Sequence, residues 1–150
     1  MNPFMIGGIA IALWRMLKKD KYTVLGQVDG NNVEISVRLA MLSGGHCEIT
    51  DSDYQTYSLK DLDKFMSHYH DQQPYLNQFW DCDNFAIHYY DMIEIAMPGC
   101  LCGFCHVTKP DGKHALNFIF DENNEMWLVE PQNSTRFKKP DDWQIYFAYI

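Results

Sequence analysis

The strongest constraint on the fold lies between residues 79 and 130, where a helical pattern is followed by three strand-like runs. Apolar residues recur at spacings of three and four and stop at Pro98-Gly99, which predicts a buried helix that begins near Cys82. Short turn signals at residues 110–112 and 122–125 separate the runs, so we expect an antiparallel meander. The helical positions are Phe85, Ala86, Tyr89, Met92, Ile93 and Ala96, and the runs cover residues 100–108, 114–120 and 126–129.

The N-terminal half carries a different pattern. Residues 22–28 and 33–39 alternate with period two around an Asp-Gly-Asn-Asn turn, which predicts a β-hairpin, and residues 51–55 are polar and loop-like. Ser58 and Asp61 form a capping-box-like start for a helix that runs to the break before Pro74. A final strand is expected over residues 143–150. Together these elements indicate an α+β fold in which a Cys-bearing helix packs on an antiparallel sheet.

The length of 150 residues fits one domain, which we place at residues 21–150, preceded by an apolar helix at residues 1–20. The formal net charge of −8 would repel a phosphate backbone, so nucleic acid is not an expected partner. Five cysteines are an odd number without the spacing of a secreted disulfide framework, which favours a reducing compartment.

The most hydrophobic segment runs from Phe4 to Leu17 and ends in Lys18-Lys19. It is shorter than the roughly twenty residues that a bilayer-spanning helix needs, and it lacks the n-region and cleavage site of a secretory signal. Three interpretations stay open. The segment packs on the core, docks on a protein partner, or lies on a membrane surface. We expect a cytoplasmic or virion-associated protein that is not secreted through a signal peptide.

Cys82 is the first candidate for chemistry, because it stands where the buried helix is expected to begin. The N–H groups and dipole of a helix N-terminus stabilise an anion and so favour a reactive thiolate. Asp81 and Asp83 flank the thiol and would raise its pKa unless a positive group lies nearby. Both carboxylates could cap the helix; alternatively, they are hard oxygen ligands that suit Ca²⁺ or another divalent cation.

His114 and Glu130 complete a nucleophile–base–orienter set with Cys82. His114 begins one strand of the meander and Glu130 ends the next, and in a meander these two ends lie side by side. The histidine would accept the thiol proton, and the acid would fix the orientation of the imidazole. Cys82, His114 and Glu130 are therefore the predicted catalytic residues.

The motifs W-D-C-D-N-F-A, H-A-L-N-F and W-L-V-E-P-Q resemble the papain-like C-terminal domain of the fungal agglutinin family and its phage and bacterial relatives. The resemblance covers roughly residues 50 to 150. It implies a papain-like (transglutaminase-like) fold and a cysteine peptidase activated by calcium or a similar cation, with Cys82, His114 and Glu130 as its triad. The sugar-binding domain of the agglutinins is not covered, so no lectin activity is implied.

Two departures from that family concern the cleft. Lys113 stands where relatives tend to have glycine before the histidine, and Leu76 stands at the papain spacing where a glutamine would serve the oxyanion. Gln78, or else Gln73, is the alternative oxyanion donor.

Cys100, Cys102, Cys105 and His106 invite a zinc interpretation, but their spacing has no paired second half. We expect core cysteines on a buried strand. The predicted function is a cysteine hydrolase acting on a peptide or protein. The alternative is a catalytically silent papain-like protein of a phage virion or of a host interaction.

Overall fold

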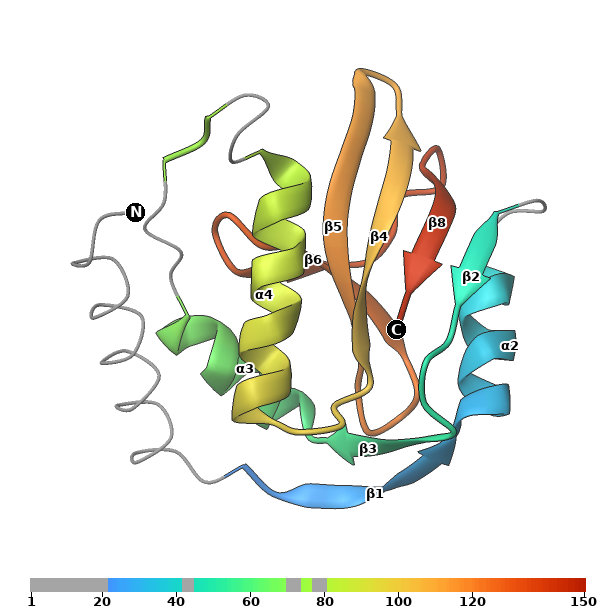
Figure 1. Cartoon of the computed structure of the whole chain (residues 1–150), viewed down its shortest axis with the longest axis vertical. Coiled ribbons are helices and arrows are strands. Elements are labelled where there is room, and N and C mark those ends of the chain that lie inside the picture. The colour runs from blue at the N-terminus through green and yellow to red at the C-terminus, as the bar shows by residue number, and fades with distance from the viewer. Residues whose placement is uncertain (1–21, 42–44, 70–73, 77–80) are drawn as a thin grey trace.

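The computed structural model describes residues 22–41, 45–69, 74–76 and 81–150, and Figure 1 shows their arrangement. Three helices and eight strands make up this part of the chain. In chain order they are β1 (Val24–Asp29), α2 (Gly30–Ala40), β2 (His46–Glu48), β3 (Asp53–Tyr57), α3 (Leu59–His68), α4 (Cys82–Ala96), β4 (Cys102–Lys109), β5 (Gly112–Phe120), β6 (Met126–Glu130), β7 (Thr135–Phe137) and β8 (Gln144–Tyr149).

A six-stranded sheet in the order β2-β8-β4-β5-β6-β7 forms the centre of the molecule (Figure 1). Its pairs are antiparallel except for β2 and β8, which run parallel. Strands β1 and β3 form a separate antiparallel pair at one end of the molecule. The sequence therefore predicted the α+β class and the β4–β5–β6 meander correctly, but the sheet is mixed rather than antiparallel.

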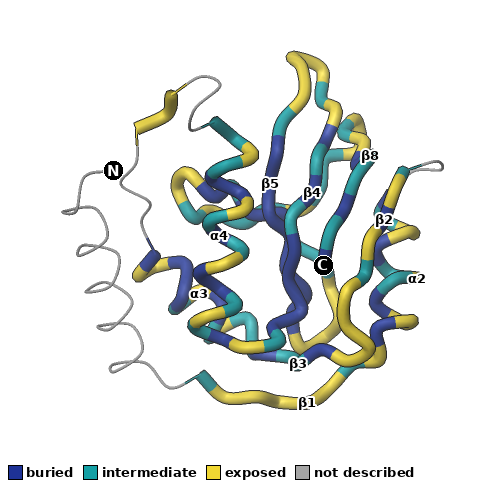
Figure 2. Tube along the Cα trace, viewed as in Figure 1, coloured by how far each residue is buried: buried dark blue, intermediate teal, exposed yellow. Residues whose placement is uncertain are grey.

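The sheet separates two hydrophobic cores. On one face, Val33 and Val37 of α2 are buried against every second residue of the central strands, such as Leu116 of β5. On the other face α3 and α4 pack over Ile119 and Val129. Figure 2 shows β5 buried along most of its length, as expected for a strand covered on both faces.

Helix α4 begins where the sequence predicted. Asp81 occupies the N-cap, and its N–H donates to Asn84 Oδ1 at 3.2 Å. The predicted apolar positions face the sheet, where Phe85, Ala86 and Tyr89 are buried. Asn117, itself 1% exposed, donates through Nδ2 to Ala86 O at 2.8 Å and so ties the helix to β5. The start of α3 is also confirmed, because the Ser58 side chain caps it by accepting from Asp61 N.

The predicted hairpin over residues 22–39 is wrong in its second half, which is helix α2. The alternation of Val33, Ile35 and Val37 fits a strand, but Val33 and Val37 are also four apart and share one helical face. The expected turn is instead the start of this helix, where the Asp29 side chain accepts from Asn31 N at 2.7 Å. Glu34 and Arg38 add an ion pair of 2.7 Å one turn apart.

Residues 51–55 were expected to be a loop, but most of them belong to β3, which pairs with β1. Their polar sequence gave no sign of this pairing. The segment from Phe4 to Leu17 lies outside the described residues. Among the helices of the described ranges, none is both long and apolar enough to cross a membrane.

Candidate functional site

Cys82 is the first residue of α4 and its side chain is half-buried beside β5. Its thiol donates to Asp83 Oδ1 at 3.4 Å, within the same helical turn. The backbone of Ala115 in β5 is the other polar group beside the sulfur. The thiol therefore lies between the helix N-terminus and the opening residues of β5.

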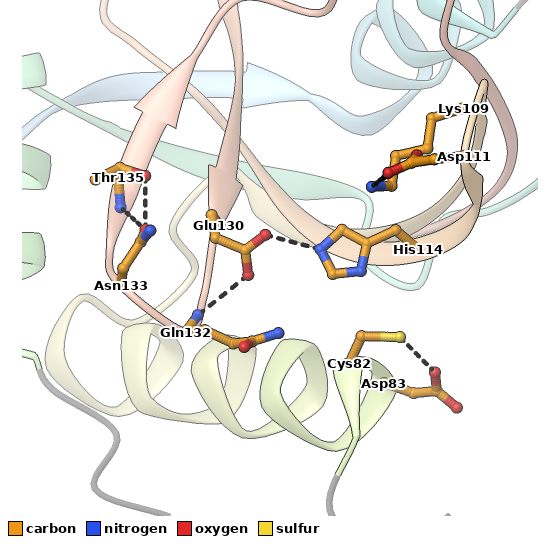
Figure 3. A network of polar contacts seen from close by, with 9 residues as sticks. All are labelled: Cys82, Asp83, Lys109, Asp111, His114, Glu130, Gln132, Asn133 and Thr135. Carbon is orange, nitrogen blue, oxygen red and sulfur yellow. Dashed lines mark hydrogen bonds and ion pairs between the residues drawn. The ribbon is translucent and has the colours of Figure 1, made fainter. Parts of the chain in front are cut away.

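His114 and Glu130 meet on two adjacent antiparallel strands. His114 Nε2 donates to Glu130 Oε2 at 2.7 Å, and the side chains are 18% and 21% exposed. Glu130 Oε1 accepts from Gln132 N at 3.3 Å, which holds the carboxylate from its other side. Because Glu130 takes Nε2, the second ring nitrogen of His114 is left on the side of the ring that faces Cys82 (Figure 3). The ends of β5 and β6 thus bring His114 and Glu130 together, and Cys82 at the start of α4 lies on the side of the free ring nitrogen (Figure 3). The catalytic roles of the three residues stay a prediction.

The electrostatics of the site favour the protonated thiol. Burial raises the pKa of Cys82, and the carboxylates of Asp83 and Asp81 raise it further. The Ala115 backbone acts in the opposite direction but does not outweigh them. In this arrangement Cys82 is a resting thiol that a ligand or the imidazole must deprotonate.

The predicted divalent-cation site finds no third ligand among the described residues, which contain no group of three His, Cys, Asp or Glu side chains able to hold a metal ion. Asp83 is engaged with the Cys82 thiol instead. Binding of Ca²⁺ or another divalent cation by Asp81 and Asp83 stays a prediction. The two oxyanion candidates, Gln78 and Gln73, lie outside the described residues.

The zinc interpretation of the cysteine cluster is excluded by the placement of its members. Cys105 belongs to the core on the α2 face, whereas Cys100 and Cys102 belong to the core on the α4 face. All five cysteines are free, and these three are at most 2% exposed. The prediction of core cysteines is confirmed.

An aromatic surface that the sequence did not reveal borders the thiol on the α4 face of β4 and β8. The Tyr146 and His106 rings are 5.9 Å apart, and His106 is 5.3 Å from Phe147. Burial raises the pKa of Tyr146, and the charges of Asp83 and Cys82 contribute, so its phenol lies close to the thiol. Lys113 stands where the relatives tend to have glycine before the histidine. Its Nζ lies 5.2 Å from the Tyr146 ring centre, so Lys113 lies at the rim of the aromatic surface. The rings come from strands that are distant in sequence, so no local motif marked them.

A second feature that the sequence did not reveal is an open polar pocket of about 520 Å³. It lies between α3 and the connection from β6 to β7. The residues that line it are Asp63, Met66, Ser67, Asn133, Ser134, Thr135 and Arg136. Arg136 closes one side through a two-point ion pair with Asp63, in which Nε lies 2.7 Å from Oδ1 and Nη2 lies 3.2 Å from Oδ2.

Two solved structures share this fold. PSL1a in complex with E64 matches with a TM-score of 0.72 and 22% identity over 83% of this chain. Polyporus squamosus lectin bound to the human-type influenza-binding epitope Neu5Acα2-6Galβ1-4GlcNAc matches with a TM-score of 0.67 and 22% identity, also over 83%. The chain is similar to fungal lectin structures. It spans 51% and 49% of their chains, and at this identity the likeness shows the fold alone.

No protein-family model matches the sequence. A search of curated proteins gives no match either.

The comparison contradicts several expectations drawn from the resemblance. The two solved structures that share this fold are lectin structures rather than a papain-like peptidase domain, so the family identification is contradicted. The predicted cysteine hydrolase and its peptide or protein substrate are contradicted, because one lectin is solved with a carbohydrate epitope. The silent virion or host-interaction protein is contradicted too, and neither interpretation is carried further.

Proposed function

We propose that Cys82, His114 and Glu130 form a covalent thiol site that transfers an acyl group from a donor to an amine or hydroxyl acceptor. The observation that carries this proposal is the 2.7 Å bond between His114 Nε2 and Glu130 Oε2. That bond orients the imidazole so that its free nitrogen faces the thiol at the start of α4 (Figure 3). A thiol, a base and an orienting acid in this order are the parts that nucleophilic catalysis needs.

In the proposed reaction, Cys82 Sγ attacks the acyl carbon of the donor and His114 takes the thiol proton. The leaving group departs with that proton, which leaves a thioester on Cys82. The acceptor then attacks the thioester and gives its proton to His114, and this proton returns to the thiol. The unpaired N–H groups at the start of α4 would stabilise the oxyanion of each tetrahedral intermediate.

The papain-like (transglutaminase-like) chain path is part of this proposal. Its support is the arrangement of the elements: the nucleophile opens a helix packed on the sheet, and the base and the orienting acid lie on neighbouring strands. PSL1a, which shares this fold, is solved in complex with E64, and E64 is therefore the probe used to test the site.

Mass spectrometry of the chain treated with E64 tests the site. We expect one adduct, on Cys82, whose rate falls at least about tenfold in His114→Ala and less in Glu130→Gln, as for removal of a general base and of its orienting group. His46→Ala, an exposed histidine on the edge strand β2, is the matched control and should react as the parent does. Equal adduct rates in the parent and His114→Ala would refute the proposed base.

Transfer itself is tested with p-nitrophenyl acetate as donor and hydroxylamine as acceptor. The parent should form acetohydroxamate faster than the uncatalysed reaction of the two reagents, and Cys82→Ser should not exceed that background rate. If E64 alkylates Cys82 but no acyl transfer is detected, Cys82 is a reactive thiol and the transferase function is contradicted.

Glycan binding is a second candidate, favoured by the lectin that shares this fold and is bound to a sialylated trisaccharide. The chain corresponds to about half of that lectin. The polar pocket supports this candidate, because its hydroxyl, amide and charged groups are those that bind sugar hydroxyls. A glycan array probed with the labelled chain tests it: reproducible binding to a defined set of glycans is expected, and an array without signal would refute it.

A further inference from the structure

The walls of the pocket between α3 and β7 are fixed before any ligand arrives. The Arg136 guanidinium is clamped by Asp63 and lies 4.3 Å from the centre of the Trp127 ring. Asn133 Oδ1 accepts from both Thr135 N, at 3.1 Å, and Thr135 Oγ1, at 2.6 Å. A preorganised polar wall binds a ligand with a smaller entropic cost than a flexible one.

Ser134 connects this wall to the interior. It has a positive φ of 54°, unusual for a residue with a side chain, and its hydroxyl donates to Tyr69 O at 3.0 Å. Burial raises the pKa of Tyr89, and the Ser134 hydroxyl lowers it. The Tyr89 hydroxyl therefore lies beside Ser134. Tyr89 is 1% exposed, and its hydroxyl has no hydrogen-bond partner within the part of the chain that the structure describes.

The charges and groups of the lining define the ligand. Asp63 and Arg136 cancel each other, so the lining carries no net charge and does not favour a free anion or cation. The hydroxyl oxygens of Ser67 and Thr135 donate within the chain and can still accept, and the amide nitrogen of Asn133 can donate. Such groups suit vicinal hydroxyl groups. Met66 supplies an apolar contact for the C–H face of a ring. The volume of about 520 Å³ lies within the range of small-molecule sites.

We propose that this pocket binds one neutral sugar residue, a hexose or an N-acetylhexosamine, through hydrogen bonds to Asp63, Asn133 and Arg136. This inference rests on glycan binding, the second candidate function, and gives it a location and a ligand class. The pocket discriminates against sialic acid, because a lining without net charge does not compensate for the desolvation of the carboxylate of that sugar.

Two-dimensional amide NMR of the full chain tests the location. Galβ1-4GlcNAc and Neu5Acα2-6Galβ1-4GlcNAc are titrated separately. We expect the neutral disaccharide to shift the amide signals of residues 63–67 and 133–136, and the sialylated trisaccharide to cause smaller shifts at the same concentration.

The variant Asp63→Asn tests the ligand class, because it keeps the side-chain shape and gives the lining a net positive charge. We expect the affinity for the sialylated trisaccharide, relative to the neutral disaccharide, to rise about fivefold, which corresponds to one charge pair at about 4 Å in water. A gain of binding cannot come from unfolding. Asp91→Asn, an exposed aspartate on α4, is the matched control and should leave the ratio unchanged.

The outcomes separate this inference from the function on which it rests. Sugar-dependent shifts confined to other residues would overturn the pocket and leave glycan binding standing. The absence of shifts with either glycan, together with an empty glycan array, would overturn both. Shifts at the pocket with an unchanged ratio in Asp63→Asn would overturn the neutral-sugar preference.

Discussion

The Cys82 thiol is controlled by the residue that follows it. Asp83 Oδ1 accepts its hydrogen bond and, after burial, is the largest contributor that raises its pKa. At neutral pH, below the pKa of the thiol, the alkylation rate follows the thiolate fraction. The repulsion between the Asp83 carboxylate and a thiolate 3.4 Å away costs about 1 kcal/mol in water. This free energy changes the thiolate fraction by a factor of about five.

We therefore predict that Asp83→Asn raises the rate at which iodoacetamide alkylates Cys82 about fivefold at pH 7. Asp91→Asn on the same helix serves as the control and should alter the rate little. Rates are measured by mass spectrometry of quenched samples. An unchanged or lower rate in Asp83→Asn would mean that Asp83 orients the thiol rather than suppressing its ionisation.

Asp121 is the buried carboxylate of the fold, at 2% exposure. It accepts from Asn123 N at 2.9 Å, Glu125 N at 3.0 Å and Trp127 Nε1 at 3.0 Å. Burial raises the pKa of Asp121, but these donors outweigh it and bring the pKa below the usual range. Its stabilising effect is therefore complete above about pH 4, the ordinary pKa of an unfolded aspartate, and is lost as the pH falls through the lower folded value.

We predict that Asp121→Asn lowers the free energy of unfolding by about 1 to 3 kcal/mol at pH 7, the cost of losing hydrogen bonds to a charged group. The difference from the parent should shrink as the pH falls below 4. Urea unfolding at pH 7 and pH 3 measures it, with the exposed Asp141→Asn as control. A difference that stays constant with pH would assign the effect to packing instead of charge.

The candidate triad could be found from the sequence because each member stands at the end of an element. A cysteine before a helical pattern and two residues at facing strand ends are placed by local rules alone. The polar pocket could not be found in this way. Asp63 and Arg136 are 73 residues apart, and no periodicity indicates that α3 crosses the end of β7.

Helix α4 depends on one side chain of the sheet for its position. Asn117 Nδ2 donates to Ala86 O at 2.8 Å and to Gly103 O at 3.1 Å, so it joins the helix to two neighbouring strands. The side chain of Asn117 therefore faces α4. Removal of this amide leaves two carbonyl oxygens without their donor in a buried place.

We predict that Asn117→Ala lowers the free energy of unfolding by about 2 kcal/mol or more, measured by chemical denaturation. Asn32→Ala, an exposed position of α2, should change it by less than about 0.5 kcal/mol. A small effect of Asn117→Ala would show that apolar packing alone holds α4 on the sheet.

The elements differ in how far the sequence determined them. In helices α3 and α4 the apolar residues recur at spacings of three and four, and each helix has a recognisable N-terminal start. A helix was therefore the only interpretation that fitted these segments. Helix α2 has apolar residues at every second position, a pattern that serves a strand or, through Val33 and Val37, a helix with one buried face. Tertiary packing against β4 and β5 decides between them. The parallel pairing of β2 with β8 joins residues about 100 apart, which no local pattern encodes.

For the whole molecule, the two cores place the cysteines in different classes of accessibility. Cys82 is half-buried at the site, whereas Cys47, Cys100, Cys102 and Cys105 are buried. Burial raises the pKa of Cys105 to about 12 and that of Cys102 well above its ordinary value. These buried thiols can be alkylated only when the fold opens.

We predict that iodoacetamide modifies Cys82 first in the native chain and all five cysteines in denaturant. Cys47 should follow Cys82, because it lies on the three-residue strand β2 at the edge of the sheet, where local opening needs the least free energy. Peptide mapping at successive times gives the order. The Asn117→Ala variant should accelerate labelling of Cys100, Cys102 and Cys105 by a larger factor than labelling of Cys82, since the buried thiols can be alkylated only on opening. Equal native rates at Cys82 and Cys105 would be incompatible with a sheet that separates two closed cores.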